Sequence, residues 1–171
     1  HWVHNGYVTV DGEKMSKSLG NFLTAHDLLD RAPGEAIRLS LLAAHYRQPL
    51  DFSVDGIEQA KGALDRLYGA LADASDVADA EPATNEFTAP VVAALEDDLN
   101  TPRALAEMHE LATALNKAEY PGERAKLKEA LALSGTLLGL LDQDPDTWLK
   151  HGESTEIDNL VAARTAARAA R

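Results

Sequence analysis

Two lysines and two serines alternate along a short polar segment near the start of the chain. Lys14 and Lys17 lie three residues apart, Ser16 and Ser18 supply hydroxyl groups, and Gly20 follows them. Ammonium groups act as point charges for polyphosphate, and a pliable loop can place them where charge develops as pyrophosphate leaves. The residue types therefore suit a triphosphate-binding loop, although the K-x-x-K spacing alone is far more typical of a solvated polar turn.

The residues around this segment predict the elements that position it. Alternation over Tyr7–Val10 predicts a short strand, Asp11-Gly12 predicts a tight turn, and the polar residues 13–21 predict a loop. Thr24 and Asp27 have the spacing of a capping box, which predicts a helix through about Arg31. Because one hairpin-sized piece of sheet is not stable alone, we expect the strand to pair with something absent from this chain or to be poorly ordered.

Beyond residue 24 the spacing of leucine, isoleucine and valine predicts a mostly helical chain. We expect a helix from Pro33 to about His45-Tyr46, an extended segment at residues 49–52, and a frayed helix end and loop at residues 73–86. Further helices are expected after Ser53, Thr88, Thr101, Pro121, Pro145 and Thr155. The predicted fold class is mainly α: a short strand and loop, two linking helices and an antiparallel bundle of four or five helices.

Charge is distributed unevenly along the 171 residues, which carry 28 acidic and 16 basic side chains and a net charge of −12. This excess of acid argues against holding nucleic acid by bulk electrostatics. The acidic residues are concentrated between residues 51 and 158, whereas the end of the chain carries three arginines at helical spacing and no acid: Arg164, Arg168 and Arg171. That basic stripe suits either phosphate contact or a solvated face.

Composition excludes several classes of protein. The sequence has no Cys, so it contains no disulfide, thiolate zinc site or Cys nucleophile. It also lacks an apolar run long enough to span a bilayer and lacks the features of a signal peptide. We expect a soluble, cytoplasmic protein that does not bind membranes.

Four motifs resemble those of one enzyme family. KMSKS at residues 14–18, here named the KMSKS loop, is similar to the second signature of class I aminoacyl-tRNA synthetases. Three further motifs narrow the resemblance to cysteinyl-tRNA synthetases: WVHNGYV at 2–8, HYRQPLDFS at 45–53 and DDLNTP at 97–102. The resemblance extends over essentially the whole chain, and HYRQPLDFS and DDLNTP carry most of its selectivity.

The resemblance implies an activity and a set of site residues. It implies that Lys17 contacts the ATP phosphates and stabilises the departing pyrophosphate, that Lys14 assists, and that Met15, Ser16 and Ser18 complete the ATP site. The implied reaction is attack of the cysteine carboxylate on the α-phosphate of ATP in the presence of Mg²⁺. Transfer of cysteine to the terminal adenosine of tRNA(Cys) then follows.

The resemblance also implies a division of the chain. Residues 1–23 would end the catalytic domain, residues 24–52 would reach the tRNA stem, and residues 53–171 would form a helical bundle of the DALR type. The HIGH motif and the zinc site that selects cysteine would belong to sequence before His1, with no metal ligand in this segment. We therefore expect this segment alone to be inactive. We expect the whole enzyme to be a monomer.

Two other groups of residues have structural alternatives. His45 and Arg47 suit the C-terminal end of a helix, where cations complement the dipole, and the resemblance adds a possible tRNA contact for Arg47. Asp97 and Asp98 could form an acid–base pair, but electrostatic support of the following helix N-terminus is the favoured interpretation.

Two alternative functions stay open at this point. One is the related ligase that couples cysteine to a glucosaminyl-inositol acceptor in mycothiol synthesis, which shares the KMSKS loop and a helical tail. Leu19 and the motif from Arg47 to Ser53 favour the tRNA enzyme. The other is a non-catalytic helical module that binds tRNA or a protein partner, and the acidic middle of the chain weakens its nucleic-acid version.

Overall fold

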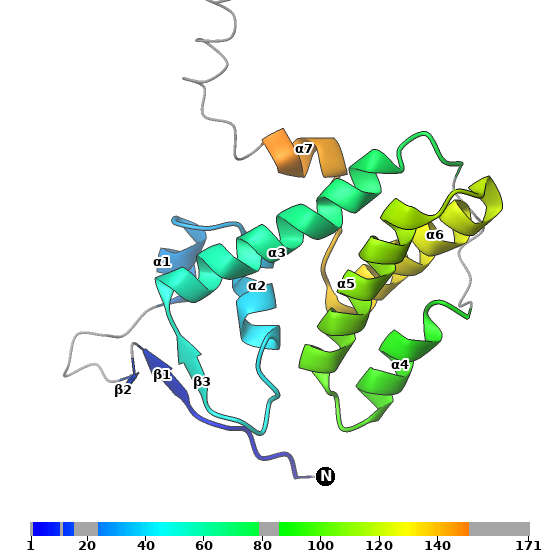
Figure 1. The fold of residues 1–171 in the computed structure, drawn as a ribbon. Helices are drawn as coiled ribbons and strands as arrows, with labels where there is room; N and C mark the ends of the chain where they lie inside the picture. Colours follow the sequence, from blue (N-terminus) through cyan, green and yellow to red (C-terminus); the bar gives the residue numbers. More distant parts are fainter. Residues whose placement is uncertain (1, 11, 16–23, 79–85, 151–171) are drawn as a thin grey trace, which may run out of the picture.

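The computed structural model describes residues 2–10, 12–15, 24–78 and 86–150 (Figure 1). Helices make up most of this part, as the sequence predicts. Its elements in chain order are β1 (Val8–Val10), β2 (Glu13–Lys14), α1 (Ala25–Leu29), α2 (Gly34–Leu42), β3 (Leu50–Phe52), α3 (Val54–Asp73), α4 (Ala89–Glu96), α5 (Thr101–Lys117), α6 (Pro121–Leu138) and α7 (Pro145–Lys150). The helix expected after Thr155 lies outside the described residues.

The three strands form one small sheet in the order β2-β1-β3. β1 and β2 pair antiparallel around the turn at Gly12, with Thr9 opposite Lys14. β1 and β3 pair in parallel, with Val8 opposite Leu50 and Val10 opposite Phe52. Because parallel strands need a long crossover, the segment that carries α1 and α2 runs between them.

This sheet corrects two predictions. The sequence predicts that the opening strand has no partner in this chain, which is wrong, because β3 supplies that partner about forty residues later. The sequence also predicts a loop from Glu13 onward, which is wrong at Glu13 and Lys14, because they form β2. The first error concerns pairing with a strand remote in the sequence, which local residue patterns do not encode, whereas the second concerns the short hairpin around Gly12.

The starts of the helices follow the sequence closely. At α1 the Thr24 side chain accepts from the Asp27 N–H at 3.1 Å and the Asp27 carboxylate accepts from the Thr24 N–H at 3.2 Å, so the capping box is confirmed. The Ser53 hydroxyl likewise accepts from the Gly56 N–H at the start of α3.

The end of α2 differs from the prediction. The helix ends at Leu42, not near His45-Tyr46. Pro49 disfavours helical geometry at Gln48, and a turn closed by the Gln48 N–H and the His45 carbonyl redirects the chain into β3.

The long helix α3 is the centre of the molecule. It packs against α2, α5 and α7, while α5 packs against α4 and α6 (Figure 1). The sheet lies near the N-terminal end of α3, and α4, α5 and α6 lie together on the right of the view in Figure 1. The core consists of side chains that are almost fully inaccessible to solvent, the largest being Leu64, Leu67, Tyr68, Met108, Leu115, Leu127 and Leu131. No helix within the described ranges is long and apolar enough to cross a membrane.

A polar network joins α2 to the segment between α6 and α7. The buried Tyr68 hydroxyl donates to the Glu35 carboxylate at 3.0 Å, and the same carboxylate accepts from the Leu141 N–H at 3.0 Å. The Tyr68 oxygen accepts from the Gln143 N–H at 3.2 Å. Burial of the phenol raises the pKa of Tyr68 well above its usual value. Trp148 stacks on the Tyr68 ring with centroids 4.7 Å apart, which holds α7 on α3.

The chain before β1 passes very close to the turn before β3. The Gly6 N–H donates to the Tyr46 carbonyl at 2.7 Å. A Cβ atom at Gly6 would overlap the Gln48 carbonyl group and lie 2.9 Å from the Pro49 nitrogen. Only glycine fits at this position without displacing backbone.

The Tyr68 network generates a first prediction. Tyr68→Phe removes the donor to Glu35 and leaves the Gln143 N–H without its acceptor, so we expect the free energy of unfolding to fall by about 1–3 kcal/mol. Urea unfolding followed by circular dichroism measures the change. Tyr120→Phe is the matched control, because Tyr120 is 72% exposed, and it should leave stability unchanged. Equal midpoints for the two variants would contradict the proposed network.

The close approach at Gly6 generates a second prediction. Gly6→Ala should lower the free energy of unfolding by about 1–3 kcal/mol, because backbone atoms must move to admit the methyl group. Gly62→Ala is the control within α3, where an added Cβ meets nothing within 4 Å. That control should stabilise the protein by up to about 1 kcal/mol. Shifts of the same sign in thermal unfolding would contradict this packing.

Candidate functional site

The start of the KMSKS loop is held by the sheet. Lys14 ends β2 opposite Thr9, and the half-buried Met15 follows it. Ser16, Lys17 and Ser18 lie outside the described residues, and the chain is described again from Thr24, which caps α1. The loop is therefore anchored by a paired strand on one side and by a capped helix on the other.

Asp51 on β3 fastens the hairpin that leads into the loop. Its Oδ1 atom accepts from the Thr9 hydroxyl at 2.7 Å and from the Gly12 N–H at 2.8 Å. These two bonds lower the pKa of Asp51, with the Thr9 bond contributing most. Sequence reasoning missed this residue, because no local pattern connects position 51 with a turn thirty-nine residues earlier.

A second cluster joins the HYR and DDLNTP motifs, which are far apart in the sequence. Arg47 donates from Nε to Asp98 Oδ2 at 2.6 Å and from Nη2 to Asp98 Oδ1 at 3.0 Å. The Tyr46 hydroxyl donates to the same Oδ1 atom at 2.7 Å. The Arg47 guanidinium also lies 5.0 Å from the centre of the Tyr46 ring, and His45 stacks on that ring. We name Tyr46, Arg47 and Asp98 the carboxylate clamp.

The clamp gives these residues roles other than those that the sequence favours. Arg47 does not cap α2, because that helix ends five residues earlier at Leu42. The side-chain cap of α5 comes from Asn100, which accepts from the Arg103 N–H, and not from Asp98. Asp98 instead binds Arg47 and Tyr46, and its backbone is left-handed with φ 55°.

The clamp has a clear charge state at neutral pH. The bond from Arg47, followed by that from Tyr46, lowers the pKa of Asp98 to about 2. The hydrogen bond that each makes to Asp98 raises the pKa of Arg47 and the pKa of Tyr46. Since the folded pKa of Asp98 is depressed, the stability from the clamp is present above pH 3.8 and is lost as the pH falls toward 2.

The other predicted nucleic-acid contacts are not described. Arg164, Arg168 and Arg171 all lie beyond residue 150, outside the described ranges. Arg47 is described, and its side chain is 57% exposed although it is paired with Asp98.

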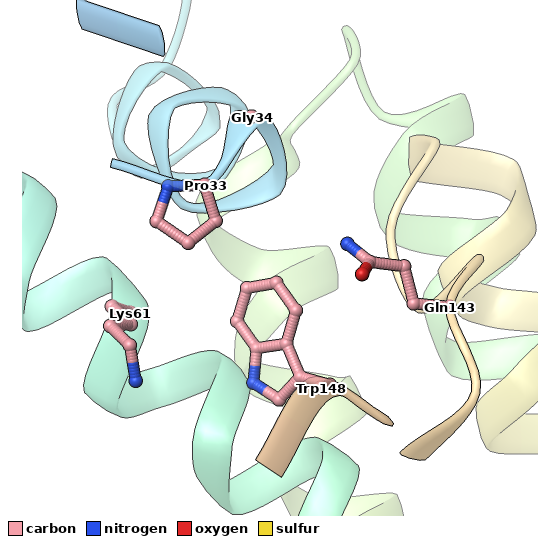
Figure 2. Close-up of a pocket in the computed structure, with 5 residues that line it drawn as sticks. All are labelled: Pro33, Gly34, Lys61, Gln143 and Trp148. Atoms are coloured by element: carbon pink, nitrogen blue, oxygen red, sulfur yellow. The ribbon is translucent and has the colours of Figure 1, made fainter. Parts of the chain in front are cut away.

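A cavity of about 320 Å³ lies between α2, α3 and α7 (Figure 2). Trp148 points into its centre, with Pro33 and Gly34 on one side and Lys61 and Gln143 on others. The indole N–H donates to Asp65 at 2.8 Å, and Lys61 pairs with the same carboxylate at 2.9 Å. These bonds serve the packing of α7. Across the part of the chain that the structure describes, no three metal-ligating side chains form a group that could hold a metal ion.

Comparison with protein families gives two matches, in order along the chain. Residues 1–62 match the class I (C) catalytic domain of tRNA synthetases, and residues 90–142 match the DALR domain. Among solved structures, the Agrobacterium radiobacter LeuRS–tRNA–LeuAMS ternary complex is similar over 88% of this chain and 22% of its own chain, with a TM-score of 0.63. Its sequence identity is 21%, so the likeness concerns the fold.

The curated relatives are more specific. A cysteine–tRNA ligase from Paramagnetospirillum magneticum is 54% identical over 99% of this chain, and one from Rhodospirillum rubrum is 52% identical over all of it. A third, from Xanthomonas campestris, is 52% identical over 99%. The chain spans 36–38% of the length of these relatives. Since half of its residues are shared with each of them along its full length, the chain belongs to the cysteine–tRNA ligase family of class I synthetases.

Proposed function

We propose that the chain contributes the ATP-phosphate loop and tRNA-contacting helices to a cysteine–tRNA ligase. The whole enzyme would activate cysteine with ATP to cysteinyl-adenylate and transfer it to tRNA(Cys) in the cytoplasm, as a monomer. The observation that carries the proposal is the KMSKS motif, which begins at a paired strand and precedes a capped helix in a chain 54% identical to such a ligase. We also propose the division into residues 1–23, 24–52 and 53–171.

The proposed chemistry of this chain is electrostatic. Lys17 would bind the ATP phosphates and stabilise negative charge on the departing pyrophosphate, while Lys14 assists from the end of β2. Met15, Ser16 and Ser18 would complete the phosphate site, with the hydroxyls donating to phosphate oxygens. The hairpin bonds of Asp51 support this proposal, because they fix the strand from which the loop departs.

The proposal assigns no metal ligand to this chain. Mg²⁺ bound to the triphosphate would neutralise part of its charge. The zinc ion that the family resemblance implies requires thiolate ligands, and this sequence has no Cys. The residues of this chain therefore position the loop, and the metals belong with ATP and with other parts of the ligase.

The proposed RNA contacts are four arginines. Arg47 lies in the segment between α2 and β3, where the side chain is more than half exposed. Arg164, Arg168 and Arg171 recur at helical spacing in a stretch without acid. Guanidinium groups bind phosphate with two parallel hydrogen bonds, which suits contact with the RNA backbone.

Lys17→Ala tests the proposed ATP site in a full-length ligase that carries this sequence. We expect the rate of cysteine-dependent ATP–pyrophosphate exchange to fall by roughly 100-fold or more, because one charge-stabilising donor is lost. Lys117→Ala is the matched control, since Lys117 is an exposed lysine in the last turn of α5, and it should retain full activity. An exchange rate that is unchanged by Lys17→Ala would remove the basis of the proposal.

Replacement of Arg164, Arg168 and Arg171 by alanine tests the RNA contacts. We expect the KM for tRNA to rise by about three- to tenfold while the KM for ATP stays constant, because only phosphate contacts to RNA are lost. Lysine at the same three positions keeps the charge and should restore most of the affinity. If the alanine and lysine variants bind tRNA equally well, the stripe is a solvated face.

A further inference from the structure

We propose that Asp98 is a positioning residue for the transfer of the amino acid to tRNA. Through the carboxylate clamp it fixes the α4–α5 end of the helical bundle relative to the sheet from which the KMSKS loop departs. This inference rests on the proposed function, since it assigns a role within that reaction to a residue outside the proposed ATP site.

The clamp bridges elements that are remote in sequence. Tyr46 and Arg47 lie in the turn before β3, whereas Asp98 lies between α4 and α5, more than fifty residues later. A neutral bond beside the clamp joins the same two parts of the chain, because the Thr101 hydroxyl at the start of α5 donates to the Leu42 carbonyl at 2.8 Å. The α4–α5 turn is therefore attached both to the last residue of α2 and to the turn that follows it.

The turn that holds Asp98 is continuous with the sheet. The Tyr46 carbonyl accepts from the Gly6 N–H at 2.7 Å, and the Leu50 N–H donates to the Tyr7 carbonyl at 3.0 Å. From there β1 pairs with β3 on one side and with β2 on the other. A chain of direct bonds thus runs from Asp98 through Tyr46 and Gly6 to the strand beside Lys14.

The geometry of the clamp is specific. A guanidinium that donates twice to one carboxylate fixes both the distance and the angle between the two groups. The third bond, from Tyr46, leaves the carboxylate little freedom to rotate. Asp98 and Leu99 both have left-handed backbones, with φ 55° and 54°, which non-glycine residues adopt only where the surrounding structure holds them. The clamp provides that hold at the junction between α4 and α5.

The charge balance of the clamp favours a positioning role for Asp98. Asp98 neutralises Arg47, so the pair presents little net charge to a phosphate. An exposed ion pair also contributes little to global stability, and α2 stays packed on α3 and bonded through Glu35 without it. Loss of Asp98 should therefore disturb the relative placement of bundle and sheet more than it disturbs folding.

The test uses a full-length ligase that carries this sequence, with the variants Asp98→Asn and Asp97→Asn. Asp97 is the matched control, because it is an exposed neighbour of the same charge on the same turn. Two reactions are measured: cysteine-dependent ATP–pyrophosphate exchange, which requires no tRNA, and steady-state aminoacylation of tRNA. We expect Asp98→Asn to lower kcat/KM for tRNA by about tenfold, because misplacement of reacting groups slows transfer, and to keep exchange within about twofold. Asp97→Asn should change neither.

Two further variants separate positioning from a direct contact and from misfolding. Tyr46→Phe removes one hydrogen bond to Asp98 with minimal change of shape, and it should lower kcat/KM for tRNA less than Asp98→Asn does. If Asp98→Asn fails to fold, Tyr46→Phe provides the test of the clamp. In a double-mutant cycle with Arg47→Gln, the double variant should be no worse than the more impaired single variant, because both changes open the same clamp. Additive losses would mean that Asp98 acts independently of Arg47, and would overturn the inference.

The outcomes also distinguish this inference from the proposed function. If the unsubstituted enzyme catalyses neither exchange nor aminoacylation, the proposed function is wrong. If it catalyses both and Asp98→Asn leaves aminoacylation unchanged, or lowers exchange and aminoacylation equally, Asp98 has no positioning role in transfer.

Discussion

The parallel pairing of β1 with β3 is the constraint on which the arrangement of the molecule depends. Three residues on each strand bring the start of the chain to a segment about forty residues later. The hairpin that leads into the KMSKS loop is too small to be stable alone, so this pairing and the Asp51 bonds to Thr9 and Gly12 hold it in place. The position of Lys14, the first residue of the loop, therefore depends on β3, a strand outside the loop's own motif.

The same pairing fixes the turn between α2 and β3. Once β3 lies beside β1, the chain from Ala43 to Pro49 must reverse within a few residues, with Gly6 against its backbone. That reversal places Tyr46 and Arg47 at the α4–α5 junction, where the Asp98 carboxylate accepts hydrogen bonds from both. At the opposite end of α2, Glu35 binds Tyr68 and the backbone of Leu141. Helix α2 is thus attached to the bundle at both ends, and the sheet and the helices form one connected framework.

The electrostatics of the described helices suit placement of RNA better than strong attraction of it. The chain has a net charge of −12, and the exposed Arg47 is compensated by Asp98. Nucleic-acid affinity that depends on released counterions requires uncompensated basic groups. Under the proposed function, an acidic bundle connected to the sheet before the KMSKS loop would instead contribute by geometry, since the proposed transfer step would require the acceptor end of the RNA to meet an adenylate at a defined position.

Local sequence determined much of this protein. The capping box at Thr24, the N-cap at Ser53, the proline starts of α4, α5 and α6 and the leucine spacing of the core all concern residues within one or two turns of each other, so they could be predicted. The KMSKS, HYRQPLDFS and DDLNTP motifs indicated the family for the same reason, as contiguous patterns. The partner of β1, the strand at Glu13 and Lys14, the early end of α2, and the roles of Asp51 and Asp98 required the tertiary structure. The partner of β1 and the roles of Asp51 and Asp98 depend on contacts between residues brought together by the crossover and the helix packing, and such contacts leave no local pattern in the sequence.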